Sequence, residues 1–284
     1  MAVPPLEALS AGGFEVVLVV TGADKRRGRG SGMSPSPVKS AALDLGLAVS
    51  HRVEDVLDVG ADLGVVVAFG RLIRQPILER LAMVNVHFSL LPRWRGAAPV
   101  ERALLAGDQV TGTSLMQLEE GLDTGPVFDE VRVPIPERAT ADQLRELLVR
   151  AGSEQLVRCL NSGLRGPSPQ QGEATYASKI LPNELCIDWQ RGCSDIDRTV
   201  RLGSAWTLFR GKRLRVLAAR PLAAGQVSAQ GAVSLPGHLV GQSVCCGDGG
   251  WMHLETVQPE GKAPMPATAW LAGARVAKGE LLGS

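Results

Sequence analysis

The sequence predicts an α/β fold: a doubly wound, mostly parallel sheet in the larger N-terminal part and a smaller β-barrel at the C-terminal end. Two observations carry this prediction. From Glu15 to Phe88, short apolar runs alternate with helix-like segments, and such alternation is typical of parallel sheets covered by helices. After about residue 190, short strand-like runs separated by turns predominate, which indicates a second, mainly β domain.

The first elements follow from local signals. A short helix is expected between Pro4-Pro5 and Gly12-Gly13, because proline suits a first helical turn and glycine a helix end. The apolar run Glu15–Thr21 predicts a fully buried strand. The next expected elements are a helix from Ser36-Pro37 to Gly46, a strand at Leu63–Phe69, a helix at Pro76–Leu81, a strand from Met83 and another at Thr111–Leu118.

The second half of the chain begins with a long helix. Leucines at helical spacing over Ala141–Leu160 predict that this helix closes the first domain. The glycine- and proline-rich residues that follow have the composition of a linker. Short strands are then expected at Thr207–Phe209, Leu214–Ala218, His238–Cys245 and Trp251–Val257.

Composition and charge exclude several classes of protein. The chain has 284 residues, 45% of them hydrophobic, and a formal net charge of +1. A charge this small excludes wholesale coating of nucleic acid, so any RNA contact must come from a local patch. The five cysteines form no Cys-x-x-Cys pair, and the start shows no signal-peptide pattern. We therefore expect a cytoplasmic protein with no metal and no membrane contact.

The most informative stretch is the strand from Met83 to Phe88. Its alternation predicts that Asn85 and His87 project from one face, while Val86 and Phe88 turn to the core. An amide and an imidazole two residues apart place hydrogen-bond donors around one small volume, which suits a developing oxyanion. Taken alone, a single histidine on a strand is more often structural.

A carboxylate turn follows the next strand. Asp123 lies between Gly121 and Gly125 in the turn Gly-Leu-Asp-Thr-Gly, and such a turn lets the carboxylate lean toward a neighbouring strand and orient the imidazole. Asp-Thr-Gly is also a common structural turn. We expect a catalytic trio of Asn85, His87 and Asp123.

A pocket is expected at the carboxyl ends of the strands, where open parallel sheets bind ligands. Three loops should meet there: the segment from Ala68 to Ile73, the loop after His87 and the turn around Asp123. The alternative for Arg71 to Ile73 is a plain loop into the next helix.

A glycine-rich basic loop lies between Gly22 and Lys39. Such a loop is usually only solvated, but mobile cationic side chains beside a pocket also suit phosphate contacts on RNA.

The run Asn-x-His-x-Ser-Leu-Leu-Pro at Asn85–Pro92, followed by Leu-Asp-Thr-Gly at Leu122–Gly125, closely resembles the formyltransferases that use 10-formyltetrahydrofolate. The longer run Leu91–Pro99 resembles the branch that formylates methionine on initiator tRNA. The resemblance implies a catalytic domain at residues 1–162, a linker at 163–190 and a tRNA-binding barrel of oligonucleotide-binding type at 191–284. It implies folate contacts from Gly70, Arg71, Leu72, Ile73, Ser89, Leu90, Leu91 and Pro92, and tRNA contacts from Lys25, Arg26, Arg27, Arg29 and Lys39. Further phosphate contacts could come from Lys179, Arg201, Arg210, Lys212, Arg213 and Arg215.

The expected reaction is transfer of a formyl group from 10-formyltetrahydrofolate to the α-amine of methionyl-initiator tRNA, by a monomer without a metal. Asn85 and protonated His87 would stabilise the oxyanion, and Asp123 would keep His87 charged. The alternatives are a formyltransferase acting on a small amine, a 10-formyltetrahydrofolate hydrolase and, in another class, a non-catalytic RNA-binding protein.

Two features differ from the family pattern. The family has a strand and a Gly-Thr-Pro turn just before the segment that matches Ala2–Pro5, and this sequence lacks both. That strand is either encoded upstream or lost, and in its absence the strands from Glu15 and Leu63 should flank a gap or be drawn together. In addition, Gly203–Trp206 replaces a stretch that is more often proline-rich.

Overall fold

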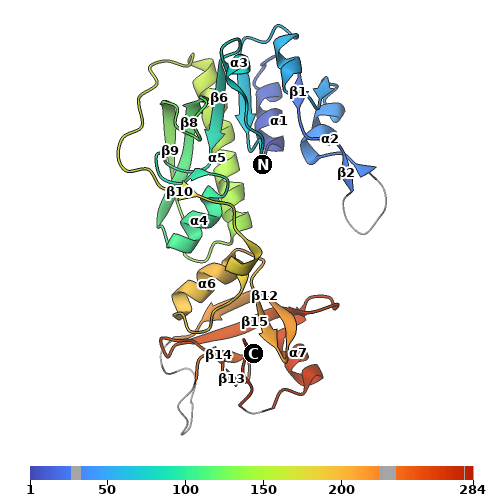
Figure 1. Cartoon of the computed structure of the whole chain (residues 1–284), viewed down its shortest axis with the longest axis vertical. Helices are drawn as coiled ribbons and strands as arrows, with labels where there is room; N and C mark the ends of the chain where they lie inside the picture. The colour runs from blue at the N-terminus through green and yellow to red at the C-terminus, as the bar shows by residue number, and fades with distance from the viewer. Residues whose placement is uncertain (27–32, 224, 226–234, 278, 284) are drawn as a thin grey trace. The chain divides into compact units, whose positions relative to one another are not determined.

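The computed structural model describes residues 1–26, 33–223, 225, 235–277 and 279–283 (Figure 1). The chain divides into two compact units. The first comprises Met1–Val100, Gln109–Ile135 and Leu144–Ser178, and the second comprises Glu101–Asp108, Pro136–Gln143 and Lys179–Ser284. Two of the predicted tRNA contacts, Arg27 and Arg29, lie outside the described residues.

The elements up to the site strand are short. They are α1 (Val3–Ala11), β1 (Val19–Val20), β2 (Lys25–Arg26), β3 (Met33–Ser34), α2 (Pro37–Asp44), β4 (Val49–Ser50), the 3-10 helix η1 (Glu54–Leu57), β5 (Gly64–Val67), α3 (Gln75–Leu78) and β6 (Met83–His87). The elements that follow it are β7 (Arg95–Gly96), α4 (Pro99–Ala106), β8 (Val110–Gln117), β9 (Val127–Pro134), α5 (Ala141–Asn161) and β10 (Tyr176–Ala177).

The central sheet of the first unit has four strands in the order β5-β6-β8-β9. β5 and β6 are parallel, whereas β8 runs antiparallel to both β6 and β9. The sheet is therefore mixed, and the expectation of a mostly parallel sheet is wrong for it. The physical reason is that α4 does not return the chain to the start of β6: β8 enters at the end where β6 leaves, with Ser114 opposite His87.

The strand expected at Glu15–Thr21 is much shorter than predicted. Only Val19 and Val20 form a strand, which pairs in parallel with Val49 and Ser50 of β4. Residues 16–18 are partly exposed rather than fully buried. Within the described residues, β1 and β5 belong to separate sheets with no ladder between them, so the two strands that were expected to flank a gap or to meet are not paired.

The core of the first unit lies between the sheet and α5, which runs along β6 and β8 (Figure 1). Leu144, Leu148 and Leu156 of this helix are fully buried. A Cβ at Gly152 would lie 2.8 Å from Val86 Cγ1, so the glycine permits close approach of helix and sheet. Because Val86 faces α5, the neighbouring residues of β6, Asn85 and His87, face the opposite side.

The second unit contains an antiparallel sheet of six strands in the order β11-β12-β15-β14-β13, with β16 paired to β15. Its elements are η2 (Pro182–Leu185), α6 (Cys193–Arg201), β11 (Trp206–Phe209), β12 (Lys212–Pro221), β13 (Leu239–Val240), β14 (Ser243–Cys245), β15 (Trp251–Pro259), β16 (Met265–Pro266) and α7 (Ala267–Ala274). The four predicted strands are found, and the one expected at His238–Cys245 is split into β13 and β14. Closure into a barrel of oligonucleotide-binding type stays a prediction.

A bidentate ion pair anchors η2 within the second unit. Arg102 donates to both carboxylate oxygens of Glu184, at 2.6 and 3.0 Å, and the Leu181 N–H donates to the same carboxylate at 2.9 Å. These donors hold the pKa of Glu184 below its ordinary value of 4.5. A lowered carboxyl pKa stabilises the fold above the ordinary value and loses that contribution as pH falls through the lowered pKa.

The variant Glu184→Gln should therefore unfold at a lower temperature than the wild type at neutral pH, by ~2–4 °C or less, since a partly exposed ion pair contributes about 1 kcal/mol at most. Thermal unfolding followed from pH 7 down to below 4.5 measures this, and the difference should shrink as the wild-type carboxyl is protonated. A difference that stays constant over this range would contradict the assigned ion pair.

No helix in the described part of the chain combines the length and the apolar character needed to span a bilayer.

Candidate active site

β6 provides the floor of the site. All five of its residues, Met83–His87, are buried, and the side chains of Asn85 and His87 face away from α5. The two residues are only 8% and 5% exposed. Their polar groups must therefore find partners in the protein, and these partners define the site.

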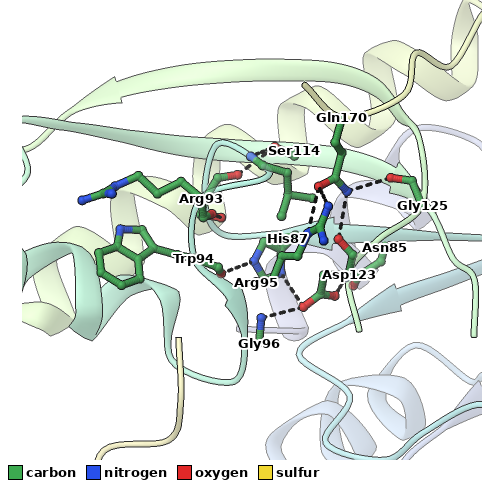
Figure 2. A network of polar contacts seen from close by, with 12 residues as sticks. Asn85, His87, Arg93, Trp94, Arg95, Gly96, Ser114, Asp123, Gly125 and Gln170 are labelled. Atoms are coloured by element: carbon green, nitrogen blue, oxygen red, sulfur yellow. Dashed lines mark hydrogen bonds and ion pairs between the residues drawn. The ribbon is translucent and has the colours of Figure 1, made fainter. Parts of the chain in front are cut away.

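One ring nitrogen of His87 is hydrogen-bonded, and the other faces a carboxylate (Figure 2). Nε2 lies 2.8 Å from the carbonyl oxygen of Trp94, and because a carbonyl can only accept, Nε2 carries a hydrogen. Nδ1 lies 3.6 Å from Asp123 Oδ2. The imidazole is thus held between the Trp94 carbonyl and the Asp123 carboxylate.

Asp123 links the three predicted residues. Its Oδ2 accepts the Gly96 N–H at 2.8 Å, and its Oδ1 accepts from Asn85 Nδ2 at 3.5 Å. The side chain is 12% exposed, and the residue has a φ of +51°, which is uncommon outside glycine. The predicted trio of Asn85, His87 and Asp123 is thus brought together in one small volume.

The route by which Asp123 reaches the trio differs from the one expected. β8 is antiparallel to β6, and its last residue, Gln117, lies opposite Val84 at the start of β6. The turn after β8 therefore leaves the sheet at the far end from His87 and folds back over the polar face of β6. Gly125 permits this path, because a Cβ there would lie 2.0 Å from the carbonyl oxygen of Gln117.

The segment from residue 168 to 177, inside the predicted linker, also belongs to the site. Gln170 bonds to Asp123, Gly125 and Arg95, as Figure 2 shows. Thr175 Oγ1 accepts the Trp94 N–H at 2.9 Å, and β10 pairs in parallel with β7. The sequence analysis missed these residues because their glycine- and proline-rich surroundings indicate a linker. Nothing in the local pattern shows that the segment runs beside Asp123 and Trp94.

The predicted folate segments follow the ends of β5 and β6, which are parallel and so finish at one edge of the sheet. In the first, Arg71 stacks on the Phe69 ring at 4.8 Å and donates to the His51 carbonyl, while Leu72 is 71% exposed and Ile73 is buried. Gly70 has nothing within 4 Å of an added Cβ.

In the second folate segment, Ser89 and Leu91 are buried. Ser89 Oγ donates to the Arg93 carbonyl, and the Leu91 N–H donates to Ser114 Oγ at 3.1 Å. Leu90 packs against Gly112, where a Cβ would lie 2.5 Å from Leu90 Cδ2, and the Leu91–Pro92 peptide is cis. Their side chains therefore build the turn, which leaves backbone groups and exposed edges for a ligand.

In the described part of the basic loop, two of the predicted tRNA contacts face solvent and a third is paired with a carboxylate. Lys25 and Arg26 are exposed in β2, which pairs with β3. Lys39 donates to Asp24 Oδ1 at 2.8 Å, and its side chain is only 19% exposed. Lys39 is thus already paired, whereas Lys25 and Arg26 face solvent.

Among the described residues, one group has the donor set of a metal site: Cys193, Cys246 and Asp248, with their ligand atoms within 4.8 Å of one another. Burial raises the pKa of both thiols, which favours the neutral forms that bind metal poorly. Both oxygens of Asp248 already accept backbone N–H groups, from Cys193 and Gly250 at 3.0 Å each. Exposed Asp248 thus binds the N–H of the first residue of α6, while Cys193 and Cys246 belong to the core of the second unit.

Comparison of this chain with known proteins identifies its family. Residues 3–160 match the formyl transferase family, and residues 179–275 match the formyl transferase C-terminal domain. The chain belongs to the formyl transferase family. The trio of this formyl transferase lies inside the first match, whereas Gln170 and Thr175 lie between the two matches.

Relatives of this formyl transferase include two named methionyl-tRNA formyltransferase. The protein from Jannaschia sp. is 41% identical, and the alignment covers 99% of this chain and 96% of that protein. The protein from Paracoccus denitrificans is 42% identical, covering 96% of this chain and 94% of that protein. The solved N-formyltransferase from Helicobacter canadensis has a TM-score of 0.69 at 17% identity, covering 91% of this chain and 95% of that one, which shows a shared fold.

Proposed function

We propose that this formyl transferase moves the formyl group of 10-formyltetrahydrofolate to the α-amine of methionine on initiator tRNA. The observation that carries the proposal is about 41% identity over both matched domains to relatives named methionyl-tRNA formyltransferase. The trio of Asn85, His87 and Asp123 supplies the donors and the charge that this acyl transfer needs.

In the proposed mechanism the amine attacks the formyl carbon and a tetrahedral oxyanion forms. One Asn85 amide hydrogen faces Asp123, and the other donates to the oxyanion. His87 acts through its positive charge, because Trp94 and Asp123 already engage its ring nitrogens. Asp123 keeps that charge in place and relays the amine proton toward the folate nitrogen as the old carbon–nitrogen bond breaks.

The folate is proposed to bind where the segments of Gly70–Ile73 and Ser89–Pro92 finish at one edge of the sheet. Exposed Leu72 offers apolar contact, and backbone groups of both segments offer hydrogen bonds. The proposal includes no metal ion in this pocket. The monomeric state, the cytoplasmic location and the domain boundaries at 162 and 190 stay predictions.

The acceptor is tested by one assay with several arms. Purified protein with 10-formyltetrahydrofolate is given methionyl-tRNA, glycinamide ribonucleotide, an amino-sugar nucleotide or no acceptor. Formyl-methionyl-tRNA in the first arm supports the proposal. Transfer only to a small amine, or release of formate without an acceptor, would instead support one of the two enzyme alternatives, and absence of folate binding would support an RNA-binding role.

The tRNA is proposed to lie against two basic surfaces. The first is the loop that contains Lys25, Arg26, Arg27 and Arg29. The second is the β11–β12 hairpin, where exposed Arg213 stacks on the Trp206 ring at 4.4 Å beside exposed Lys212. Arg201 and Arg210 contribute less, because they pair with Asp197 and Glu280.

Replacing Lys25, Arg26, Arg27 and Arg29 together by alanine should weaken tRNA binding and reduce its salt dependence. Each lost phosphate contact lowers the slope of log affinity against log salt by about one unit. Binding titrations at several salt concentrations measure this slope. Exposed Arg80, outside the loop, provides a matched control as Arg80→Ala, which should leave the slope nearly unchanged; an equal loss of folate affinity in the loop variant would mean that the loop is structural.

A further inference from the structure

We propose that Gln170 is a positioning residue for the catalytic trio, acting through Asp123. The inference rests on the proposed function and adds a residue from the segment between the two family matches. Gln170 contacts neither His87 nor Asn85 among the described hydrogen bonds; its contacts are with the turn that carries the carboxylate (Figure 2).

Both the nitrogen and the oxygen of the Gln170 side-chain amide form hydrogen bonds. Nε2 donates to the carbonyl oxygens of Asp123 and Gly125, each at 2.8 Å. Oε1 accepts from Arg95 Nε at 3.0 Å and from Arg95 Nη2 at 2.6 Å. Only a planar amide offers two donors and an acceptor in one group, so Gln170 ties the Asp123 turn to the residue that begins β7.

The hydrogen bonds of Gln170 hold the turn that carries Asp123, and the backbone conformation of this turn has to be held by its surroundings. The turn folds back from the far end of β8, and Asp123 has a left-handed φ of +51°. Such a conformation persists at functional sites only when the surroundings hold it. β7 also provides the Gly96 N–H that donates to Asp123 Oδ2, so Gln170 fixes the turn to the strand that binds its carboxylate.

The same segment reaches the other partner of His87. Thr175 Oγ1 accepts the N–H of Trp94 at 2.9 Å, and the Trp94 carbonyl accepts from His87 Nε2 at 2.8 Å. Trp94 is also left-handed, with a φ of +62°. Gln170 and Thr175 thus hold the residues on the two sides of the imidazole, which fixes its orientation.

The test compares Gln170→Ala, Gln170→Glu and the control Gln171→Ala. Gln171 is the adjacent residue of the same type and is exposed. Gln170→Ala should lower kcat by about 10²-fold, the scale of a 1 Å misplacement, with little change in the folate KM or in Tm. Gln170→Glu keeps an acceptor for Arg95 but loses both donors to the turn, so its kcat should fall as far. Gln171→Ala should match the wild type.

A positioning role through Asp123 also predicts that the losses are not additive. In an Asp123→Ala background the carboxylate is absent, so adding Gln170→Ala should lower kcat further by less than about threefold. The ¹⁵N shifts of the His87 ring should move in Gln170→Ala and not in Gln171→Ala. Equal losses in both backgrounds, or an unchanged kcat and ring shift, would overturn the inference. A wild type that formylates no methionyl-tRNA would refute the proposed function, while the ring shifts would still decide the role of Gln170.

Discussion

Replacing His87 by alanine should lower kcat for formyl transfer by about 10²–10³-fold, the usual loss when one oxyanion-stabilising group is removed. His87 ends β6 in a site where the residue is 5% exposed, so water cannot readily take the place of the missing imidazole. The backbone ladder that pairs His87 with Ser114 does not depend on the imidazole, and the fold should persist. Steady-state transfer to methionyl-tRNA, with thermal unfolding of the same samples, measures both effects.

The matched control is His253→Ala, which removes a histidine from β15 in the second unit. It should retain turnover. Asn85→Ala and Asp123→Ala should each lose most of the turnover, because they remove the amide donor and the carboxylate partner of the imidazole. Near-normal turnover in His87→Ala would refute the assigned trio.

Replacing Gly125 by alanine should lower both activity and stability. The added Cβ would lie 2.0 Å from the Gln117 carbonyl oxygen, and since both are backbone-bound atoms, the turn itself must move. That shift displaces Asp123, two residues away, and breaks the bond from Gln170 to the Gly125 carbonyl. We expect kcat to fall by about 10²-fold. We also expect Tm to fall by several degrees, because overpacking costs about 1–3 kcal/mol and each kcal/mol shifts the midpoint by ~2–4 °C.

Gly273→Ala is the control for this variant. Gly273 lies in α7, and an added Cβ there would meet nothing within 4 Å. Its kcat and folate KM should equal those of the wild type, and its Tm should not fall. If Gly125→Ala also retained full turnover, the path of the turn over β6 would be wrong.

Local sequence patterns determined the parts of the site that depend on one strand and one motif. The alternation of Met83–His87 was enough to place Asn85 and His87 on one face, because side chains of any strand alternate. Asp123 was identified by its motif, and in the structure its carboxylate lies beside both Asn85 and His87. The family itself followed from the same residues and is confirmed by the full-length relatives.

Strand direction was decided only by the tertiary structure. The apolar pattern of a strand does not indicate which neighbour the strand pairs with or in which direction. The sequence therefore predicted a strand at Thr111–Leu118 but not the antiparallel direction of β8. The run at Glu15–Thr21 has the composition of a buried strand, yet its strand covers only Val19 and Val20, which pair with β4. Hydrogen bonds to a neighbour, and not composition, set the length of a strand.

The tertiary structure also decided which residues contact the proposed catalytic trio and its neighbours. Gln170 and Thr175 lie in a segment whose composition predicts a linker, and their role comes entirely from where that segment runs: past β7, beside Asp123 and Trp94. A local pattern records the periodicity of a single element, whereas these contacts join residues 47 and 81 positions apart in the chain. The sequence by itself therefore determined which groups we propose for the chemistry, and the tertiary structure decided which groups surround them, because those contacts depend on where distant segments meet.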